Sequence, residues 1–333
     1  DFLPLPKEGE RPVLRSFSEG GEGVRNGRVV AQSFLEPYLA KVTSLLDPAS
    51  LPKTRMVVCC GNGMGGYTMP HLAPRIPGDV LPLHWELDGS FPNHEANPIK
   101  PENVADVGAA VRESRAQIGF AYDGDADRIG VVDERGELVR GDLVSVFLAR
   151  EVLRVKPGAT ILYDVRASRA VPEAITAAGG VPMATRVGHA LIKKHLRKVH
   201  AAFAGELSAH FYFGDFYGVE CTELAMLRVL KILGEAGRPL SEIVAPLQKY
   251  AYSGEVNFTV IDKAAVLAAI EARYTPTARS VTKLDGLKFD MGDWWFLVRA
   301  SNTEPLLRLV VETETKRATA QKVEEIGKVI EGR

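Results

Sequence analysis

The sequence predicts an α/β protein in which two similar α/β domains with mixed or parallel sheets precede a smaller α+β domain. Apolar strand-like runs alternate with amphipathic helical segments, as in sheets with helical crossovers. After about Pro246 the strand-like runs outnumber the helices. The length of 333 residues fits two or three domains at ~150 residues each. We therefore predict domains at 30–140, 141–247 and 248–333, preceded by a tail or linker over 1–29.

The composition excludes several classes of protein. With 46% hydrophobic and 25% charged residues, the chain has an ordinary globular composition. Lys and Arg number 41 against 42 Asp and Glu, and because the formal net charge is only -1 we expect neither nucleic acid nor a membrane as partner. No apolar run approaches the ~18 residues of a membrane helix, and the N-terminus lacks the apolar stretch of a signal peptide. Three cysteines without a C-x-x-C pair suit a reducing compartment, so we expect the cytoplasm.

The elements of the first domain follow from apolar spacing. Residues 32–46 carry apolar side chains at helical spacing, which predicts a helix. Apolar runs at 56–60 and 80–83 predict strands, and a helix over 102–115 precedes a buried strand over 117–122. This alternation is typical of a parallel sheet.

The second and third domains differ in pattern. Asp142 can cap a helix with an apolar face, strands are expected at 160–164 and 181–185, and a long helix over 222–235 completes the second domain. The third domain is predicted to end in a helix with apolar positions Ala320, Val323, Ile326 and Ile330. Its strand-like runs are 255–261, 281–284, 294–298 and 306–312.

The most specific feature is the acidic loop Asp123-Gly124-Asp125-Ala126-Asp127-Arg128, between two strand-like runs. Asp123, Asp125 and Asp127 alternate in a short loop, so their carboxylates can converge on one hard divalent cation. Arg128 adds a positive charge suited to a phosphate held against the metal. An EF-hand is excluded, because Arg128 stands where that loop requires glycine and the flanking segments resemble strands.

A glycine-rich loop, Gly61-Asn62-Gly63-Met64-Gly65-Gly66, also follows a strand. With acidic residues about 20 positions later, it matches the G-x-G-x-x-G pattern of dinucleotide-binding oxidoreductases. However, the helix that should bind pyrophosphate would contain Pro70 and Pro74, and Pro74 falls where an interior backbone hydrogen bond is needed. We keep a dinucleotide-binding oxidoreductase only as the less favoured alternative.

A third loop, Gly205-Glu206-Leu207-Ser208-Ala209-His210, follows a short apolar run. Glu206, Ser208 and His210 alternate, so in an extended segment they point to one side. A carboxylate, a hydroxyl and an imidazole on one face suit the vicinal hydroxyls of a sugar.

A fourth loop, Arg299-Ala300-Ser301-Asn302-Thr303-Glu304-Pro305, lies between two predicted strands. Its guanidinium, hydroxyls, amide and turn N–H groups form a plausible phosphate cradle. The residues that we assign to it are Arg299, Ser301, Asn302 and Thr303.

The ordered motifs D-G-D-A-D-R, G-E-L-S-A-H and R-A-S-N-T-E-P resemble those of the α-D-phosphohexomutases, the phosphomannomutase and phosphoglucomutase family. The segments 88–103, 163–171 and 185–193 are also similar, and the resemblance covers about 55 to 312. It implies an intramolecular phosphotransferase that moves a phosphoryl group between the 1- and 6-positions of a hexose. In that family a phosphoserine donates the group, and a bisphosphorylated sugar is the intermediate. The G-E-L-S-A-H loop is closest to the mannose/glucose group, which favours those hexose phosphates over amino sugars.

Roles carried over from the family follow the motifs. Asp123, Asp125 and Asp127 would bind Mg²⁺, and Arg128 would face the transferring phosphoryl group, with His189 as a second catalytic residue. Three residues would hold the sugar and four would grip the phosphate that does not react. They are Glu206, Ser208 and His210 for the sugar, and Arg299, Ser301, Asn302 and Thr303 for the phosphate.

The chain departs from the family at the phosphoserine. No T-x-S-H-N-P-type loop is present, and neither Ser16 nor Ser18 is followed by His-Asn-Pro. We therefore expect the second to fourth family domains without the first, either as a fragment or as a natural chain whose serine arrives from elsewhere. The expected protein partner is a second copy of the chain in a homo-oligomer or the missing N-terminal domain in trans. The alternative, from a different class, is a non-catalytic sugar-phosphate-binding protein. The expected small-molecule ligand is a hexose phosphate.

Overall fold

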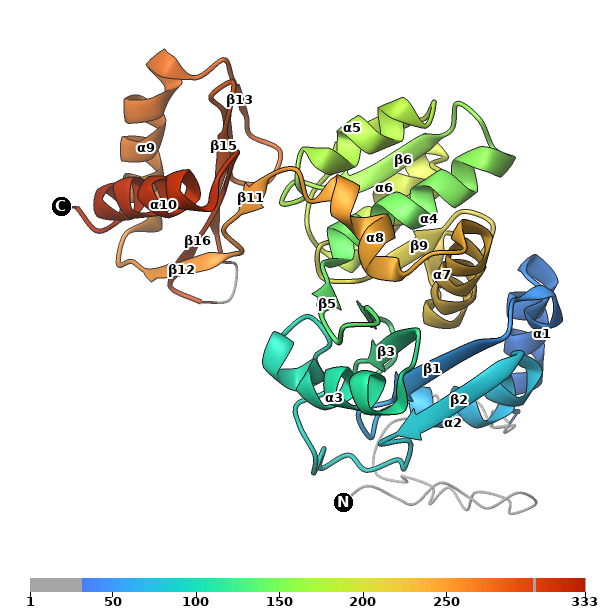
Figure 1. The fold of residues 1–333 in the computed structure, drawn as a ribbon. Helices are drawn as coiled ribbons and strands as arrows, with labels where there is room; N and C mark the ends of the chain where they lie inside the picture. Colours follow the sequence, from blue (N-terminus) through green and yellow to red (C-terminus); the bar gives the residue numbers. More distant parts are fainter. Residues whose placement is uncertain (1–31, 302–303, 333) are drawn as a thin grey trace, which may run out of the picture.

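The computed structural model describes residues 32–301 and 304–332, arranged as three parts that each contain one sheet (Figure 1). Two parts combine mixed sheets with helices, and the third is a smaller α+β unit, so the predicted fold class is confirmed. The predicted tail over 1–29 lies outside the described residues, as do Asn302 and Thr303. Among the described helices, none is both long and apolar enough to cross a bilayer.

The first sheet is mixed, in the order β2-β1-β3-β4-β5. Strand β1 pairs in parallel with β2 and β3, while β3, β4 and β5 are antiparallel. Its strands are β1 (Thr54–Cys59), β2 (Gly78–Leu83), β3 (Ile118–Tyr122), β4 (Ile129–Val132) and β5 (Leu138–Val139). Its helices are α1 (Leu35–Leu45), α2 (Gly65–Leu72) and α3 (Ala105–Ser114). Every residue of β3 is buried, as its continuous apolar run predicts.

The second sheet repeats this topology in the order β7-β6-β8-β9-β10. Strand β6 pairs in parallel with β7 and β8, and β9 and β10 continue antiparallel. The strands are β6 (Thr160–Asp164), β7 (Val181–Thr185), β8 (Phe203–Gly205), β9 (Phe211–Phe213) and β10 (Val219–Glu220). The helices are α4 (Gly141–Val155), α5 (Ala170–Ala177), α6 (His189–Val199), α7 (Thr222–Ala236) and α8 (Leu240–Val244). The β3–β4 turn of the first sheet therefore corresponds to the β8–β9 turn of the second.

The third sheet is antiparallel in the order β11-β16-β15-β14-β13, with β12 also paired to β16. Helices α9 (Lys263–Tyr274) and α10 (Lys316–Ile330) pack on it and close a separate core around the stacked rings of Phe289 and Phe296. The strands are β11 (Ala251–Tyr252), β12 (Val256–Thr259), β13 (Ser280–Thr282), β14 (Leu287–Asp290), β15 (Trp295–Ala300) and β16 (Leu306–Thr313).

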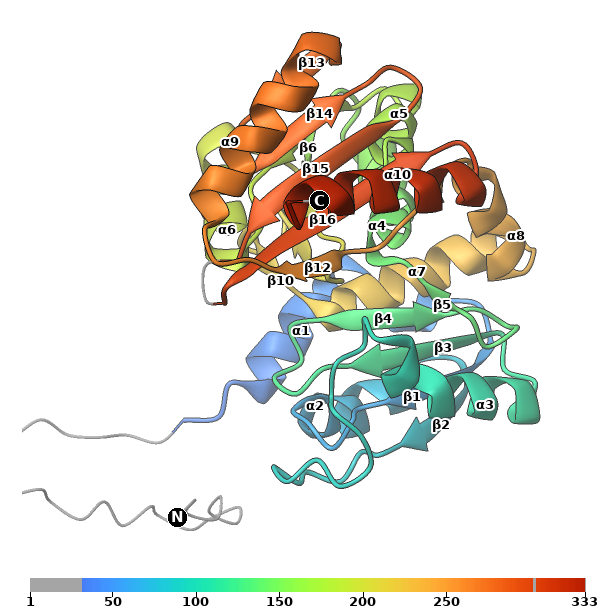
Figure 2. The ribbon, with the colours of Figure 1, turned by 90° about the vertical axis from the view of Figure 1, so that its left-hand side faces the viewer.

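The first two parts share one hydrophobic core, whereas the third has its own. Helix α7 packs against both α4 and β4, and Figure 2 shows it between the first and second sheets. Glu223 on α7 accepts hydrogen bonds from the Tyr38 hydroxyl and from Thr68 Oγ1 of the first part. A small apolar cluster that contains Val165 and Trp295 joins the second part to the third.

Several predicted elements differ from the structure. The strand expected over 281–284 ends at Thr282 as β13, because residues 283–286 form the connection to the antiparallel strand β14 and include Gly286 at φ 80°. The helix after the glycine loop ends at Leu72, and Pro74 lies in a short 3₁₀ turn. Helices α5, α6 and α9 were not predicted.

Candidate functional site

The acidic loop forms the turn between β3 and β4. Carboxylate oxygens of Asp123, Asp125 and Asp127 lie within 4.8 Å of one another, although their exposure differs. Asp123 is buried, Asp127 is half-buried and Asp125 is exposed. Ala126 has a φ of 63°, a left-handed conformation that turns the loop so that the alternating carboxylates share one side.

Arg128 holds the buried end of this loop. Its backbone N–H donates to Asp123 Oδ1 (3.0 Å) and its Nε donates to Asp123 Oδ2 (2.7 Å). A third hydrogen bond, from Nη1 to Asn97 Oδ1 (3.3 Å), fixes the far side of the guanidinium. The guanidinium therefore stands beside Asp123 and also lies 3.9 Å from Asp127 Oδ1.

The donor set fits a hard divalent cation. Burial raises the pKa of Asp123 to about 6, even though Arg128 opposes this shift. The buried carboxylate is thus short of positive charge, which a cation among the three aspartates would supply. Oxygen ligands from several carboxylates are what such ions prefer.

The loop with Glu206, Ser208 and His210 forms the corresponding turn of the second sheet, between β8 and β9. Ala209 has a φ of 67°, so it repeats the left-handed turn of Ala126. Glu206 is buried, and it accepts hydrogen bonds from Tyr212 Oη (2.8 Å) and the Gly188 N–H (3.3 Å). Its carboxylate is held in place by the protein on two sides.

His210 joins the two turns. Its Nδ1 lies 3.0 Å from Glu206 Oε2 and 3.1 Å from Ser208 Oγ, while Nε2 lies 3.2 Å from Asp127 Oδ1. Burial alone would lower the pKa of His210, but its hydrogen bonds to Asp127 and Glu206 outweigh burial and raise it to about 9. The imidazole is therefore cationic at neutral pH, and its hydrogen bond lowers the pKa of Asp127. The predicted metal and sugar residues meet here.

His189 begins helix α6 beside this pair. Its ring centroid lies 6.3 Å from that of His210, and its Nδ1 is 3.6 Å from Glu220 Oε1. Lys193 Nζ binds the other oxygen of Glu220 at 3.0 Å. The structure thus brings His189 next to the sugar loop, and adds Glu220 and Lys193, which the sequence analysis did not select.

The fourth loop connects β15 to β16. Arg299 is the second-last residue of β15, and its guanidinium lies between two carboxylates, 3.3 Å from both Glu255 Oε1 and Asp285 Oδ2. Ser301 is buried, and its carbonyl accepts a hydrogen bond from Lys263 Nζ (2.8 Å). Asn302 and Thr303, the other two residues assigned to the phosphate cradle, are not among the described residues.

Arg166 connects the sugar loop to the fourth loop, and the sequence analysis did not select it. Its Nη1 lies 3.3 Å from Glu255 Oε2, so Glu255 is shared between Arg166 and Arg299. Its Nη2 lies 3.5 Å from Ser208 Oγ and 2.8 Å from Asp164 Oδ2. The signal available in the sequence was an Asp-x-Arg pattern directly after a predicted strand.

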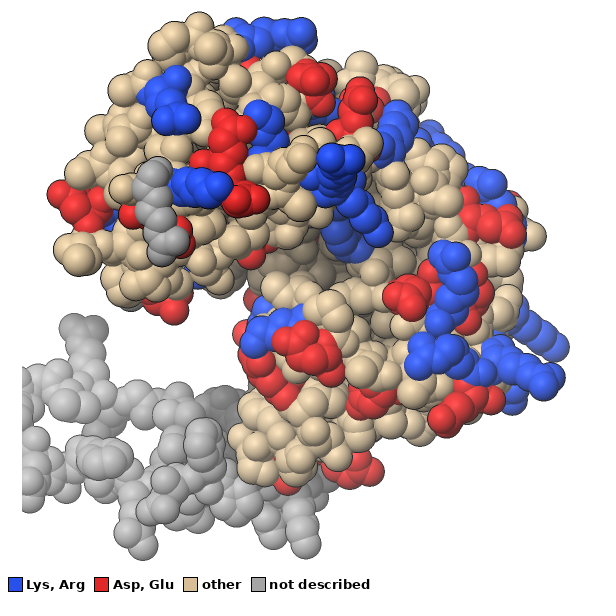
Figure 3. Space-filling model, turned by 60° about the vertical axis from the view of Figure 1, so that its left-hand side comes forward, with Lys and Arg blue, Asp and Glu red and all other residues tan. Residues whose placement is uncertain are grey.

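A hollow lies beside these contacts. Figure 3 shows a recess between the upper and lower halves of one face, with basic side chains on its rim. A cavity of about 400 Å³ lies where the three parts meet, and it is lined by residues from each of them, including Gly130, Leu207, Ala209, Tyr252 and Glu255.

The glycine loop has a structural role next to the acidic loop. A Cβ on Gly63 would lie only 2.6 Å from the Gly124 carbonyl oxygen, and the Met64 N–H donates to that oxygen at 2.9 Å. Glycine at this position therefore allows the two loops to pack together. The following helix α2 is only eight residues long and contains Pro70.

Family models match almost the whole of the described chain. Residues 36–136 match phosphoglucomutase/phosphomannomutase alpha/beta/alpha domain II, and residues 140–250 match alpha/beta/alpha domain III. Residues 255–329 match the C-terminal domain of the same family.

Individual relatives agree with these models. A protein of Xanthomonas campestris named "Phosphohexose mutases" is 37% identical over 297 residues, covering 89% of this chain and 66% of its own. A phosphomannomutase of Methanocaldococcus jannaschii is 41% identical over 243 residues, covering 73% and 54%. The crystal structure of a phosphoglucomutase/phosphomannomutase family protein from Burkholderia thailandensis superposes with a TM-score of 0.80 at 31% identity, covering 90% and 64%. The chain thus spans between half and two thirds of the length of these proteins.

Proposed function

The chain belongs to the phosphoglucomutase/phosphomannomutase family, and from this membership we propose that it works in the transfer of a phosphoryl group between the 1- and 6-positions of a hexose. Glucose and mannose phosphates are the substrates we favour. The observation that carries the proposal is a continuous polar network. It runs from Asp127 through His210 and Ser208 to Arg166, and then through Glu255 to Arg299.

We propose Mg²⁺ as the cofactor, held by Asp123, Asp125 and Asp127. Bound there, the ion would neutralise charge on the transferring phosphoryl group. The chain's own contribution is positioning: Asp123 accepts one hydrogen bond from the Arg128 backbone N–H and one from the guanidinium Nε, so the Arg128 charge is held at the acidic loop before a phosphate arrives.

The substrate residues divide between the ends of the sugar phosphate. Ser208 and cationic His210, with buried Glu206 behind them, can hydrogen-bond the sugar hydroxyls, and His189 lies close enough to join them. Arg299 and Ser301, together with Asn302 and Thr303, are proposed to bind the phosphate that does not react. Because Arg299 already faces Glu255 and Asp285, a bound phosphate must replace part of this pairing.

The phosphoryl donor is proposed to be a phosphoserine outside the three matched domains, delivered by another segment or another chain. The domain units that we propose are 30–140, 141–247 and 248–333.

Three buried free thiols support our proposal of a reducing compartment such as the cytoplasm. The balanced net charge supports a small anionic ligand over nucleic acid or a membrane.

Calorimetry with glucose 6-phosphate and with glucose, in the presence of Mg²⁺, tests the proposal. We expect the phosphorylated sugar to bind much more tightly, and equal affinities would contradict it. Because the phosphoserine is proposed to lie outside this chain, we expect the chain alone to bind the sugar phosphate without turnover. A coupled assay that follows conversion of hexose 1-phosphate, with the hexose 1,6-bisphosphate supplied and a serine-bearing first domain of the family added, then separates a mutase from the second candidate. Tight binding without turnover in the presence of that domain would favour the non-catalytic sugar-phosphate-binding protein.

A further inference from the structure

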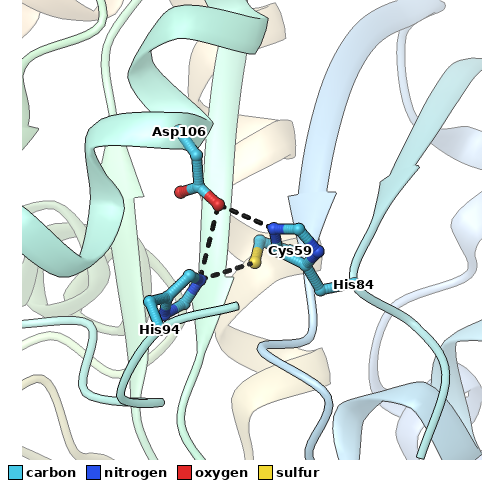
Figure 4. Close-up of side chains that lie close together, drawn as sticks. All are labelled: Cys59, His84, His94 and Asp106. Carbon is cyan, nitrogen blue, oxygen red and sulfur yellow. Dashed lines mark hydrogen bonds and ion pairs between the residues drawn. The ribbon is translucent and has the colours of Figure 1, made fainter. Parts of the chain in front are cut away.

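A second group of metal-binding side chains lies in the first part, apart from the acidic loop. It consists of Cys59, His84, His94 and Asp106, which come from β1, from the segment after β2 and from α3 (Figure 4). Cys59 ends β1, and His84 directly follows the neighbouring strand β2. The two residues lie close together because Cys59 is in register with Leu83, the last residue of β2. His94 lies in the irregular segment after β2, and Asp106 lies in the first turn of α3.

The distances are those of a nearly assembled tetrahedral site. One ligand atom from each of the four residues lies within 4.8 Å of all the others. His94 Nε2 is 3.7 Å from Cys59 Sγ and 3.5 Å from Asp106 Oδ2, while His84 Nε2 is 2.8 Å from Asp106 Oδ2. Metal–ligand bonds of ~2.0–2.3 Å in tetrahedral geometry place neighbouring ligand atoms roughly 3.3–3.7 Å apart.

Neighbouring groups orient the ligand atoms. His94 Nδ1 is 2.9 Å from the Glu95 carbonyl oxygen, to which it can donate, and this leaves Nε2 with a lone pair toward the cluster. Asp106 Oδ1 accepts a hydrogen bond from the Val107 N–H (2.7 Å), so Oδ2 is the oxygen directed at the two imidazoles. His84 has a φ of 52°, an unfavourable conformation for a histidine that nonetheless directs its ring inward.

We propose that Cys59, His84, His94 and Asp106 bind one Zn²⁺-class divalent ion. One thiolate, two imidazoles and one carboxylate form the donor set of zinc and related d-block ions, whereas Mg²⁺ takes oxygen ligands. On binding, the Cys59 sulfur loses its proton to solvent and forms the metal–sulfur bond.

The site is structural, because four protein ligands leave no open position. Between β2 and the 3₁₀ turn at Pro101–Val104 the chain runs from 84 to 100 without regular secondary structure. Through His84 and His94, the ion would fasten this segment to Cys59 of β1 and to Asp106 of α3. The same segment supplies Asn97 to Arg128, so the fastened segment also supports the acidic loop.

Cobalt substitution of the whole chain tests the proposal without any mutation. The metal-free protein, kept in excess Mg²⁺ to fill oxygen-rich sites, is titrated with Co²⁺ and monitored by absorption spectroscopy. We expect tetrahedral d–d bands and a thiolate-to-cobalt charge-transfer band that saturate at one Co²⁺ per chain and disappear on addition of Zn²⁺. Among the described residues, the other two groups of possible ligands contain no cysteine, so they cannot produce the charge-transfer band.

Variants then assign the ligands. Cys59→Ser should abolish the charge-transfer band and weaken Zn²⁺ binding more than ~100-fold, since outer-sphere partners alone contribute ~10–100-fold. Asp106→Asn, at a partly exposed helix start, should keep the band and weaken binding. Cys60→Ser and Cys221→Ser alter the other two buried free thiols and should leave both readouts unchanged. Wild-type protein without the band, or a band that survives in Cys59→Ser, would overturn the proposal.

Discussion

Asp127 Oδ1 lies 3.2 Å from His210 Nε2, and this ion pair joins equivalent turns of two sheets with the same topology. Each turn connects the third strand of its sheet to an antiparallel fourth strand, and each contains an alanine in the left-handed conformation. In addition, the Ile129 N–H donates to the Ala209 carbonyl oxygen at 3.1 Å. The repeated fold thus places an anionic turn against a turn whose histidine is cationic.

The acidic loop should bind Mg²⁺ through all three aspartates. Asp125→Asn removes one anionic ligand from the exposed side of the loop while keeping the shape of the side chain. We expect Mg²⁺ affinity to fall ~10-fold or more, which corresponds to ~1.4 kcal/mol. Calorimetry measures this, with Asp79→Asn, an exposed aspartate on β2, as the matched control. Equal affinities in all three proteins would remove Asp125 from the metal site.

Arg299 should recognise phosphate rather than sugar. Arg299→Ala removes the guanidinium fork, and we expect hexose 6-phosphate to bind ~10–100-fold more weakly, because charge-assisted hydrogen bonds contribute ~1.5–3 kcal/mol. Binding of the unphosphorylated hexose should change little. Arg154→Ala, at an exposed ion pair with Glu235, is the control. Equal losses for the two ligands would show that Arg299 only supports the docking of the C-terminal part.

Much of the site was predictable because its loops follow buried strands. The strand predicted over 117–122 contains β3, whose residues are all buried, since strands buried on both faces are continuous apolar runs. The strands predicted at 160–164 and 181–185 coincide with β6 and β7. The acidic loop was recognisable from three alternating carboxylates in one short turn. Its spacing, and not any long-range contact, identified it.

The connections between loops were not predictable. Arg166 and Arg299 meet at Glu255, which is 89 residues from one and 44 from the other. No local pattern marks a glutamate as the partner of two distant arginines. The Cys59 cluster is similar, because its four residues converge only when β1, β2 and α3 pack together. The hydrophobic core shared by the first two parts also depends on α7. Its apolar spacing predicts a helix of the second domain but does not show that the helix also packs against the first.

Ala126 and Ala209 should be sources of backbone strain. At their φ values of 63° and 67°, the Cβ atom of an alanine clashes with the backbone, which costs roughly 1–2 kcal/mol. Glycine has no Cβ atom and avoids this clash, but it loses more conformational freedom on folding. We therefore expect Ala126→Gly and Ala209→Gly each to raise the free energy of unfolding by roughly 0.5–1 kcal/mol. Urea unfolding measures it. Ala268→Gly, on the exposed side of helix α9, should instead lower it by ~1 kcal/mol. A lower free energy of unfolding in all three variants would indicate that neither turn is strained.

Lys288 should make the stability of the protein depend on alkaline pH. Its Nζ donates to the Val165 carbonyl oxygen (2.8 Å) and lies 3.7 Å from the centroid of the Trp295 ring, at the junction of the second and third parts. Burial lowers the pKa of Lys288 to about 8, against ~10.4 in an unfolded chain. Between these two values the folded protein binds fewer protons than the unfolded chain.

The free energy of unfolding therefore gains a contribution as pH rises from about 8 to ~10.4, and this contribution is lost again as pH falls through 8. Lys288→Met removes it while preserving the length of the side chain. The free energy of unfolding of wild type, relative to that of Lys288→Met, should increase by on the order of 2 kcal/mol between pH 7 and pH 10, as measured by urea unfolding. Lys283→Met, at an exposed ion pair with Glu271, should show no such shift. A difference that stays constant with pH would mean that Lys288 keeps its proton throughout, and that the cation–π contact with Trp295 holds the charge at the junction.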